Sequence, residues 1–226
     1  MPLLGRAAVA MWWDMAAEHR TEFEDWHSHE HFPERLRVPG FLRGSRWACA
    51  AGGEGFFILY ELQAYETLTS PAYFARLNAP TPWSTQMMPR HRNMVRSQCQ
   101  VLETHGGGLA GTMLTLRLSP APERADALQA HLRTLLGTLP QRPGITAAHL
   151  LRTQTPPAGT TTEQRIRGGA DAVADWIVLA TGYDADVLLE LAATGLSPIA
   201  LSQAGALPEQ TAALYRLSHT MTPADL

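Results

Sequence analysis

The segment at residues 23–35, FEDWHSHEHFPER, concentrates side chains that can transfer protons or bind metals. Its histidines are His27, His29 and His31, and three acids, Glu24, Asp25 and Glu30, precede the last of them. Because a histidine titrates near neutral pH, it can pass a proton to or from a bound molecule. On a continuous helix, His27 and His31 are four residues apart and share one face. The spacing indicates an acid–base site, a metal site or a polar helix face.

A metal site is the weaker interpretation of this segment. Two histidines and a carboxylate can ligate a metal ion, but the HExxH pattern is missing in both registers. Ser28 holds the glutamate position after His27, and the second histidine of a register starting at His29 falls on Pro33. Pro33 also favours a restart of the helix, which would turn His31 away from His27. We therefore predict no metal ligands and no cofactor.

The acid–base interpretation makes His27 and His31 candidate catalytic residues. A neighbouring carboxylate could fix the imidazole tautomer, and Glu30 and Asp14 are the candidates for this role. His29 points to another side of the helix and is expected to be solvated. The alternative is that the histidines are structural, bonding backbone carbonyls or covering the edge of a sheet.

Aromatic residues near this segment are candidates for binding a substrate. Five of the six tryptophans precede residue 84, and tryptophans line apolar pockets as readily as they fill cores. We predict that Trp12, Trp26, Trp47 and Tyr60 bind the substrate. Trp12 and Trp13 point to opposite faces of a predicted strand, so at most one of them can face a pocket on the helix side.

The basic segment MMPRHRNMVR at residues 87–96 could hold a carboxylate or an enolate through charge-assisted hydrogen bonds. From it we select Arg92 as a substrate-binding residue. The alternative is a solvated connection between a helix and a strand.

Composition excludes several classes of function. All 18 basic residues are arginine, so Schiff-base chemistry and a lysine-containing phosphate loop are excluded. The net charge of −3 predicts no binding to nucleic acid or to an anionic membrane. No apolar run approaches the roughly 20 residues that cross a bilayer. The two cysteines do not form a disulfide framework, which predicts a cytoplasmic location.

The order of expected elements repeats itself across the glycines at 106–108. In the first half we expect strands at 6–15, 39–50, 56–62 and 93–103, with helices from about Glu22, at 70–79 and at 84–92. Thr21 and Glu24 have capping-box spacing at the start of the first helix. In the second half we expect strands at 111–120, 143–153, 174–183 and 213–221, helices at 123–139 and 184–195, and a loop at about 155–170.

Each half therefore reads β-α-β-β-α-β, the ferredoxin-like arrangement. The Pro-Gly turn before the second strand recurs at an offset of 104 residues. A sheet with both helices on one side must bury its other face, in the same chain or against another. The predicted fold class is α+β, with two tandem ferredoxin-like repeats at 1–105 and 106–226 whose antiparallel sheets pack as a dimeric α/β barrel.

The sequence FEDWHSHEHFPERLRVPGFLRGSRW, followed by FFILYEL, SPAY and PTPW, resembles the dimeric α/β-barrel superfamily, nearest to its EthD-like and related uncharacterised members. The resemblance covers about residues 7–101 and implies a pocket between sheet and helices, with a homodimer as an alternative to pairing within the chain. The Glu-His pair before Pro-Glu-Arg recurs in this superfamily, so the resemblance makes His31 the first candidate and His27 the second.

The activities that the resemblance allows are cofactor-free monooxygenation and isomerisation of a small hydrophobic molecule, aromatic or polyketide-like. A non-catalytic binding or scaffold protein is the alternative, and haem binding through His149 or His219 is a further one. At the repeat offset, His31 corresponds to Leu135 and Trp26 to Ala130. We therefore expect the site in the first half and mainly a scaffold in the second.

Overall fold

The computed structural model describes residues 3–154, 159–169 and 171–226. Its strands are β1 (Ala7–Asp14), β2 (Phe41–Cys49), β3 (Gly55–Leu62), β4 (Arg92–Gly106), β5 (Thr112–Leu118), β6 (Ile145–Thr153), β7 (Trp176–Gly182) and β8 (Thr211–Met221). Its α-helices are α1 (Arg20–Trp26), α2 (Phe32–Leu36), α3 (Pro71–Asn78), α4 (Pro82–Met87), α5 (Ala125–Thr138), α6 (Thr162–Ile166), α7 (Ala185–Ala193) and α8 (Pro198–Ala204).

The strands hydrogen-bond in one closed order, β1-β3-β2-β8-β5-β7-β6-β4. The predicted α+β class with antiparallel strands in a barrel is confirmed. The chain divides into two compact units. The N-terminal unit contains Leu4–Cys99, Gln154–Val173 and Ser218–Leu226, and the C-terminal unit contains Gln100–Thr153 and Ala174–Leu217. The predicted division of the sequence at residue 105 stays a prediction.

The two Pro-Gly turns have the same local geometry. Gly40 and Gly144 both have a φ of 93°, a left-handed conformation that glycine adopts without steric cost. An irregularity of strand register follows each of them, in β2 and in β6. Each glycine carbonyl accepts a backbone hydrogen bond from just beyond the partner strand, from Gln63 at 2.8 Å and from Tyr183 at 3.0 Å. This shared geometry is what two copies of one sequence pattern would produce.

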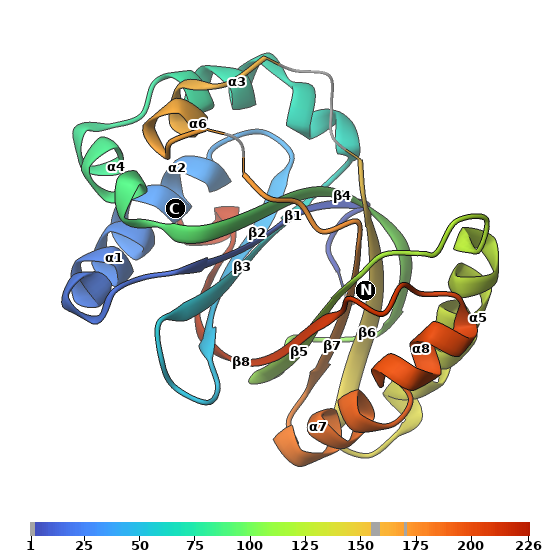
Figure 1. Ribbon diagram of the computed structural model, residues 1–226. Coiled ribbons are helices and arrows are strands. Elements are labelled where there is room, and N and C mark those ends of the chain that lie inside the picture. The colour runs from blue at the N-terminus through green and yellow to red at the C-terminus, as the bar shows by residue number, and fades with distance from the viewer. Residues whose placement is uncertain (1–2, 155–158, 170) are drawn as a thin grey trace. The chain divides into compact units, whose positions relative to one another are not determined.

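In the N-terminal unit, α1 to α4 and α6 gather on one side of the β1–β3 strands (Figure 1). Side chains alternate along β1, so Val9, Met11 and Trp13 share one face while Trp12 lies on the other. Val9 and Trp13 belong to a core cluster that also contains Phe23 and Trp26 of α1. The cluster is where the sheet meets its helices, and the candidate site lies within it.

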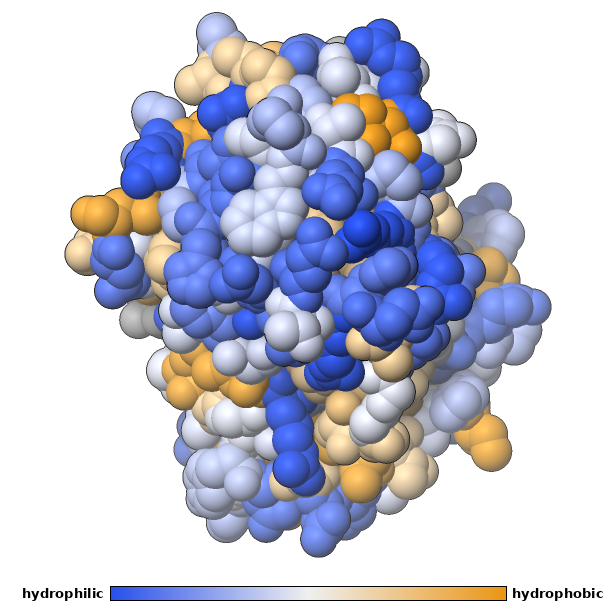
Figure 2. Space-filling view, turned by 90° about the vertical axis from the view of Figure 1, so that its left-hand side faces the viewer, coloured by the Kyte–Doolittle hydropathy of each residue, from blue (hydrophilic) through white to orange (hydrophobic). Residues whose placement is uncertain are grey.

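In the C-terminal unit, α5 is the leucine-rich core helix that the sequence predicts. Leu128, Leu132 and Leu136 are buried, as their spacing along a helix requires, while Leu135 is partly buried. Across the ranges that the structure describes, no single helix is long and apolar enough to cross a membrane. Helices α7 and α8, which are bent against each other, reach the required length and apolar composition only when they are taken together. Figure 2, seen from the side on which α1 lies, shows a largely hydrophilic surface with scattered hydrophobic residues.

Candidate functional site

The histidine segment contains one turn of π-helix. α1 ends at Trp26, residues His27–His31 form the π turn, and α2 begins at Phe32, whose N–H bonds the carbonyl of His27. The helix restarts beside Pro33, as predicted, because proline has no N–H for a regular helical bond. The expectation that this restart would separate His31 from His27 is wrong. The two imidazole rings are stacked, with centroids 5.5 Å apart.

His27 and His31 line a cavity of about 40 Å³ in the N-terminal unit. A single water needs about 10–15 Å³, so the cavity has room for a few water-sized molecules. Its polar lining residues are Trp13, Trp26, His27, His31, Arg35, Tyr60, Tyr73, His91, Arg96, Glu163 and Arg167. Its apolar lining residues are Val9, Met11, Phe41, Leu77, Met88 and Met94.

Many of the polar atoms around this cavity are buried without a hydrogen-bond partner. They are Trp13 Nε1, His27 Nδ1 and Nε2, His31 Nδ1, Arg35 Nη1, Tyr60 Oη, and His91 Nδ1 and Nε2. Buried polar groups nearly always have a partner, because an unsatisfied one costs free energy of folding. Such a gathering in one cavity indicates a place where a polar molecule binds.

The imidazoles of the cavity are held in the neutral form. Burial lowers the pKa of His27 and of His31 well below 6.5, and the positive charges of Arg46 and Arg35, respectively, lower it further. Burial, followed by the charge of Arg167, lowers the pKa of His91 to about 3. At neutral pH each ring therefore keeps one nitrogen lone pair that can accept a proton.

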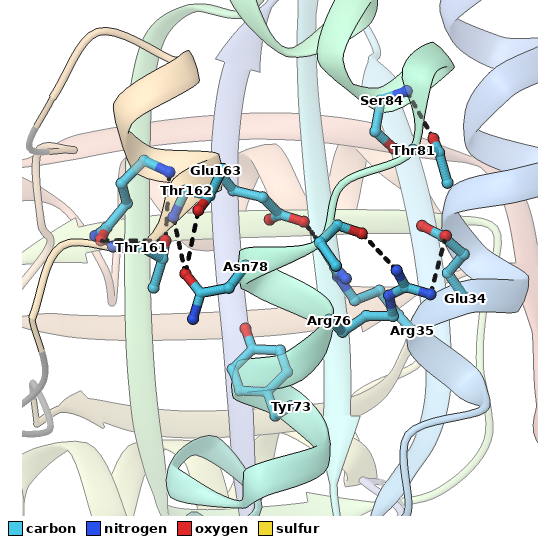
Figure 3. Close-up of polar contacts among 12 residues, drawn as sticks. Glu34, Arg35, Tyr73, Arg76, Asn78, Thr81, Ser84, Thr161, Thr162 and Glu163 are labelled. Atoms are coloured by element: carbon cyan, nitrogen blue, oxygen red, sulfur yellow. Dashed lines mark hydrogen bonds and ion pairs between the residues drawn. The ribbon is translucent and has the colours of Figure 1, made fainter.

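A buried ion pair joins Arg35 of α2 to Glu163 of α6 (Figure 3). Burial lowers the pKa of Arg35, but the charge of Glu163, the hydrogen bond that Glu163 accepts, and the neighbouring Tyr73 and Tyr60 together raise the pKa overall. Arg167 lies 3.9 Å from Glu163 and is bonded to Asp171 at 2.8 Å. The ion pair occupies Arg35 Nη2 and leaves Nη1 without a partner.

Helix α6 lies within the predicted loop at 155–170, of which residues 155–158 and 170 are outside the described part of the chain. Thr161 begins the helix with a capping box to Gln164. Its neighbour Thr162 donates its backbone N–H to Asn78 of α3 at 3.0 Å (Figure 3). The loop prediction is therefore wrong at 162–166, and this short helix brings Glu163 to the cavity wall.

Two tyrosines complete the polar side of the cavity. Arg96 donates a hydrogen bond to the hydroxyl of Tyr73 at 2.8 Å. Burial raises the pKa of Tyr60, so its hydroxyl stays protonated and can donate to a ligand.

Of the residues predicted to bind the substrate, Trp26 and Tyr60 line the cavity. The ring of Trp26 lies 4.5 Å from that of His31. Trp12 lies on the opposite face of β1, where its ring is 4.8 Å from Phe57.

Trp47 and Arg92 also lie outside the cavity lining. The indole N–H of Trp47 donates to Ser45 at 2.9 Å. Arg92 is half exposed and pairs with Glu54. In the strand register Trp12 and Trp47 both lie opposite Phe57, so Trp47 shares the sheet face of Trp12, away from the cavity. Arg92, at the start of β4, is held outside the cavity by its ion pair with Glu54. Trp12, Trp47 and Arg92 therefore do not line this cavity, and a role for them in binding a substrate stays a prediction.

The two predicted carboxylates do not contact the histidines. Glu30 accepts hydrogen bonds from Trp26 Nε1 at 3.1 Å and from Thr81 Oγ1 at 2.5 Å. Asp14 accepts one from Asn93 at 2.8 Å. Since both ring nitrogens of His27 lack a partner, neither acid fixes its tautomer. Glu30 instead orients the indole of Trp26, while Asp14 lies outside the cavity lining.

Several cavity residues were not selected from the sequence. His91 and Arg96 belong to the basic segment at 87–96, from which Arg92 was chosen instead. Arg35 follows His31 by four residues, a spacing that places both on one helix face. Glu163 and Arg167 carried no sequence signal, because the chain returns to this unit only after β6.

Among the described residues, no cluster of three or more histidine, cysteine, aspartate or glutamate side chains could hold a metal ion. Neither haem candidate lines the cavity. His149 lies in the C-terminal unit with a ring nitrogen 3.0 Å from Thr104 Oγ1, and the ring of His219 stacks on Phe32 at 5.6 Å.

Comparison with solved structures shows what the fold resembles. An anthrone oxidase-like protein is 13% identical over 96% of this chain and 93% of its own, with a TM-score of 0.63. A candidate monooxygenase from Fusobacterium nucleatum is 9% identical over 97% and 96%, with a TM-score of 0.62. Another from Lactobacillus acidophilus is 8% identical over 96% and 97%, with a TM-score of 0.60. At these identities the likeness is one of fold.

No protein-family model matches the chain, and a search of curated proteins found no match.

Proposed function

We propose that the chain is an enzyme that, without a cofactor, removes a proton from a small enolisable molecule bound in the cavity. His31 is the first candidate for the base and His27 the second. The observation that carries the proposal is the set of partnerless imidazole nitrogens of His27, His31 and His91, gathered beside a buried guanidinium, Arg35.

The chemistry follows from the charge states of these groups. A neutral imidazole accepts the proton, a role that typically contributes about 10²- to 10⁴-fold in rate. Removing the proton leaves negative charge on the oxygen of an enolate or phenolate. The guanidinium of Arg35, the indole N–H of Trp13 and the hydroxyl of Tyr60 are unused donors that can stabilise this oxygen. Their burial strengthens the effect, since the surroundings are poorly polarisable.

Two fates of the enolate are consistent with this base. In the first, the imidazole returns the proton to a different carbon of the enolate, which completes an isomerisation. With dioxygen as the oxidant, a CH₂ group becomes a carbonyl, one oxygen atom enters the product and the other leaves as water. The fold shared with an anthrone oxidase-like protein and with monooxygenase candidates favours the second fate.

The volume of the cavity limits the size of the substrate. Pockets for drug-sized ligands occupy about 300–1,000 Å³, whereas this cavity offers about 40 Å³. An aromatic or polyketide-like molecule would need the wall to move. Met11, Met88 and Met94 supply flexible side chains for such an adjustment.

Hydrogen–deuterium exchange into acetylacetone in D₂O, followed by proton NMR, tests the proposal. Its CH₂ protons are acidic, and the protein should accelerate their loss. We expect the double variant His27→Gln/His31→Gln to lose about 10²-fold or more of the acceleration. The matched control is His29→Gln, in the same segment but with a largely exposed ring, which should leave the exchange unchanged. Wild-type exchange no faster than in buffer, or an unaffected double variant, contradicts the proposal.

A non-catalytic small-molecule binding protein is the alternative, and the small cavity favours it. This alternative predicts that a small molecule binds but that no hydrogen–deuterium exchange is catalysed.

Elemental analysis and an absorption spectrum of the purified protein test the metal and haem alternatives. The EthD-like affiliation, the homodimer and the cytoplasmic location stay predictions.

A further inference from the structure

We propose that the ligand of the cavity is a small organic monoanion, above all a carboxylate, whose oxygens bind Arg35 while its neighbouring carbon faces the imidazoles. This inference rests on the proposed function, because it names the substrate class of the same site.

The wall of the cavity carries an excess of positive charge. Arg35, Arg96 and Arg167 line the cavity, and Glu163 is the acid among the described lining residues. Glu163 balances Arg35, and Asp171, behind the wall, balances Arg167. The hydrogen-bond partner of Arg96 is a neutral hydroxyl. The wall thus carries one positive charge in excess, and a partly buried positive charge favours an anionic partner.

Several buried donors in the cavity wall have no hydrogen-bond partner and are available to an anion. Glu163 occupies Nη2 of Arg35, while Nη1 is buried without a partner. A guanidinium binds carboxylates through several N–H groups at once, so Nη1 is available to a second carboxylate. The indole N–H of Trp13 and the hydroxyl of Tyr60 are further free donors in the same wall.

The candidate base His31 and the anion-binding Arg35 line the same cavity. His31 precedes Arg35 by four residues, and both line the cavity. After burial, the charge of Arg35 lowers the pKa of His31 most. A carboxylate bound to Arg35 therefore has its α-carbon or β-carbon close to a neutral imidazole.

The step that this arrangement supports is balanced in atoms and charge. A C–H bond next to a carbonyl breaks, and its proton forms an N–H bond on His31. The electron pair of the C–H bond forms a C=C bond, and the π pair of the C=O bond moves onto the oxygen to give an enolate, which Trp13 or Tyr60 can bind. The carboxylate stays ionised throughout and serves to hold the molecule in place.

Calorimetric titration with acetate and with acetamide, at constant ionic strength, tests the inference. The two molecules have nearly the same size, which suits the small cavity, and differ in charge. We expect the wild-type protein to bind acetate more tightly than acetamide. Because Glu163 competes for Arg35, Glu163→Gln should tighten acetate binding by about tenfold or more. If Glu163 had only a structural role, Glu163→Gln would bind acetate more weakly than the wild type or not at all.

The matched control is Glu34→Gln. Glu34 neighbours Arg35 on α2 and pairs with Arg76 at 3.4 Å (Figure 3), but it does not line the cavity. Glu34 acts on Arg35 through its charge and not through a hydrogen bond, so its replacement should change acetate binding by much less than Glu163→Gln does. If Glu163→Gln does not fold, Arg35→Met/Glu163→Met removes both charges together and should abolish the preference for acetate.

The inference is overturned if wild-type protein binds acetate no better than acetamide, or if Glu163→Gln binds acetate no more tightly than wild type. Failure of the proposed function has a different signature. In that case acetate binds as expected through Arg35, while deuterium exchange into acetylacetone stays at the rate of buffer.

Discussion

His27, His31 and His91 are costly residues for this fold. Each unsatisfied buried polar group typically costs about 1–3 kcal/mol of folding free energy, and five of their ring nitrogens are in that state. Nothing in the packing of Trp13, Phe23 and Trp26 around them requires an imidazole rather than another aromatic ring. The cost is understandable if the nitrogens serve a ligand.

These histidines predict how stability depends on pH. Their folded-state pKa values lie below the unfolded value of about 6.5, so below pH 6.5 the unfolded chain binds more protons than the folded one. Stability is therefore complete above pH 6.5 and is lost as the pH falls toward the folded pKa values. Each imidazole contributes a slope of about 1.4 kcal/mol per pH unit in that range.

Urea denaturation between about pH 7 and about pH 5 measures this slope. Replacing one of the three, as in His91→Gln, should reduce it by about 1.4 kcal/mol per pH unit. His29→Gln serves as the control, because its ring lies at the surface. An unchanged slope in His91→Gln contradicts the account of this buried imidazole.

At the scale of elements, the π turn and the strand behind it position the base. The ring of Phe32 packs 4.2 Å from that of His27, and it also lies against Gly44 of β2. A Cβ at Gly44 would lie 2.8 Å from the ring of Phe32 and 3.0 Å from Tyr60. The close approach of strand and helix therefore requires glycine here.

Gly44→Ala should destabilise the protein by about 1–3 kcal/mol, since the added methyl group overpacks a buried contact. The matched control is Gly55→Ala in β3, where the nearest atoms are 3.5 Å and 3.7 Å away and the change should stay within about 0.5 kcal/mol. Urea denaturation of both variants checks the difference. If Gly44→Ala and Gly55→Ala had the same free energy of unfolding, Phe32 would not be packed closely against β2.

Element order was predictable from the sequence because strands and helices alternate their apolar residues with different periods. The eight strands and α5 lie where the patterns place them. The capping box at Thr21 and Glu24 is wrong, because the helix already begins at Arg20, after a turn of 3-10 helix at Ala17–His19. Helices α6 and α8 are short and were missed, since five to seven residues show too little periodicity.

At the scale of the whole molecule, the site combines segments that local patterns cannot connect. His27 and His31 were found from spacing alone, and Trp26 and Tyr60 from residue type. Glu163 reaches the cavity because Gln154–Val173 packs with the N-terminal unit, a long-range pairing with no signature in its own sequence. Asp14 and Glu30 were chosen for nearness in sequence, and they bond other partners.

The central claim is that the imidazoles lining the cavity are uncharged at neutral pH. Heteronuclear NMR of the histidine side-chain nitrogens, recorded from about pH 7 to about pH 5, tests it most directly. The account predicts that His27, His31 and His91 keep the nitrogen shifts of neutral imidazole throughout this range. Titration of His27 or His31 to the imidazolium form near the ordinary pKa of about 6.5 would contradict it.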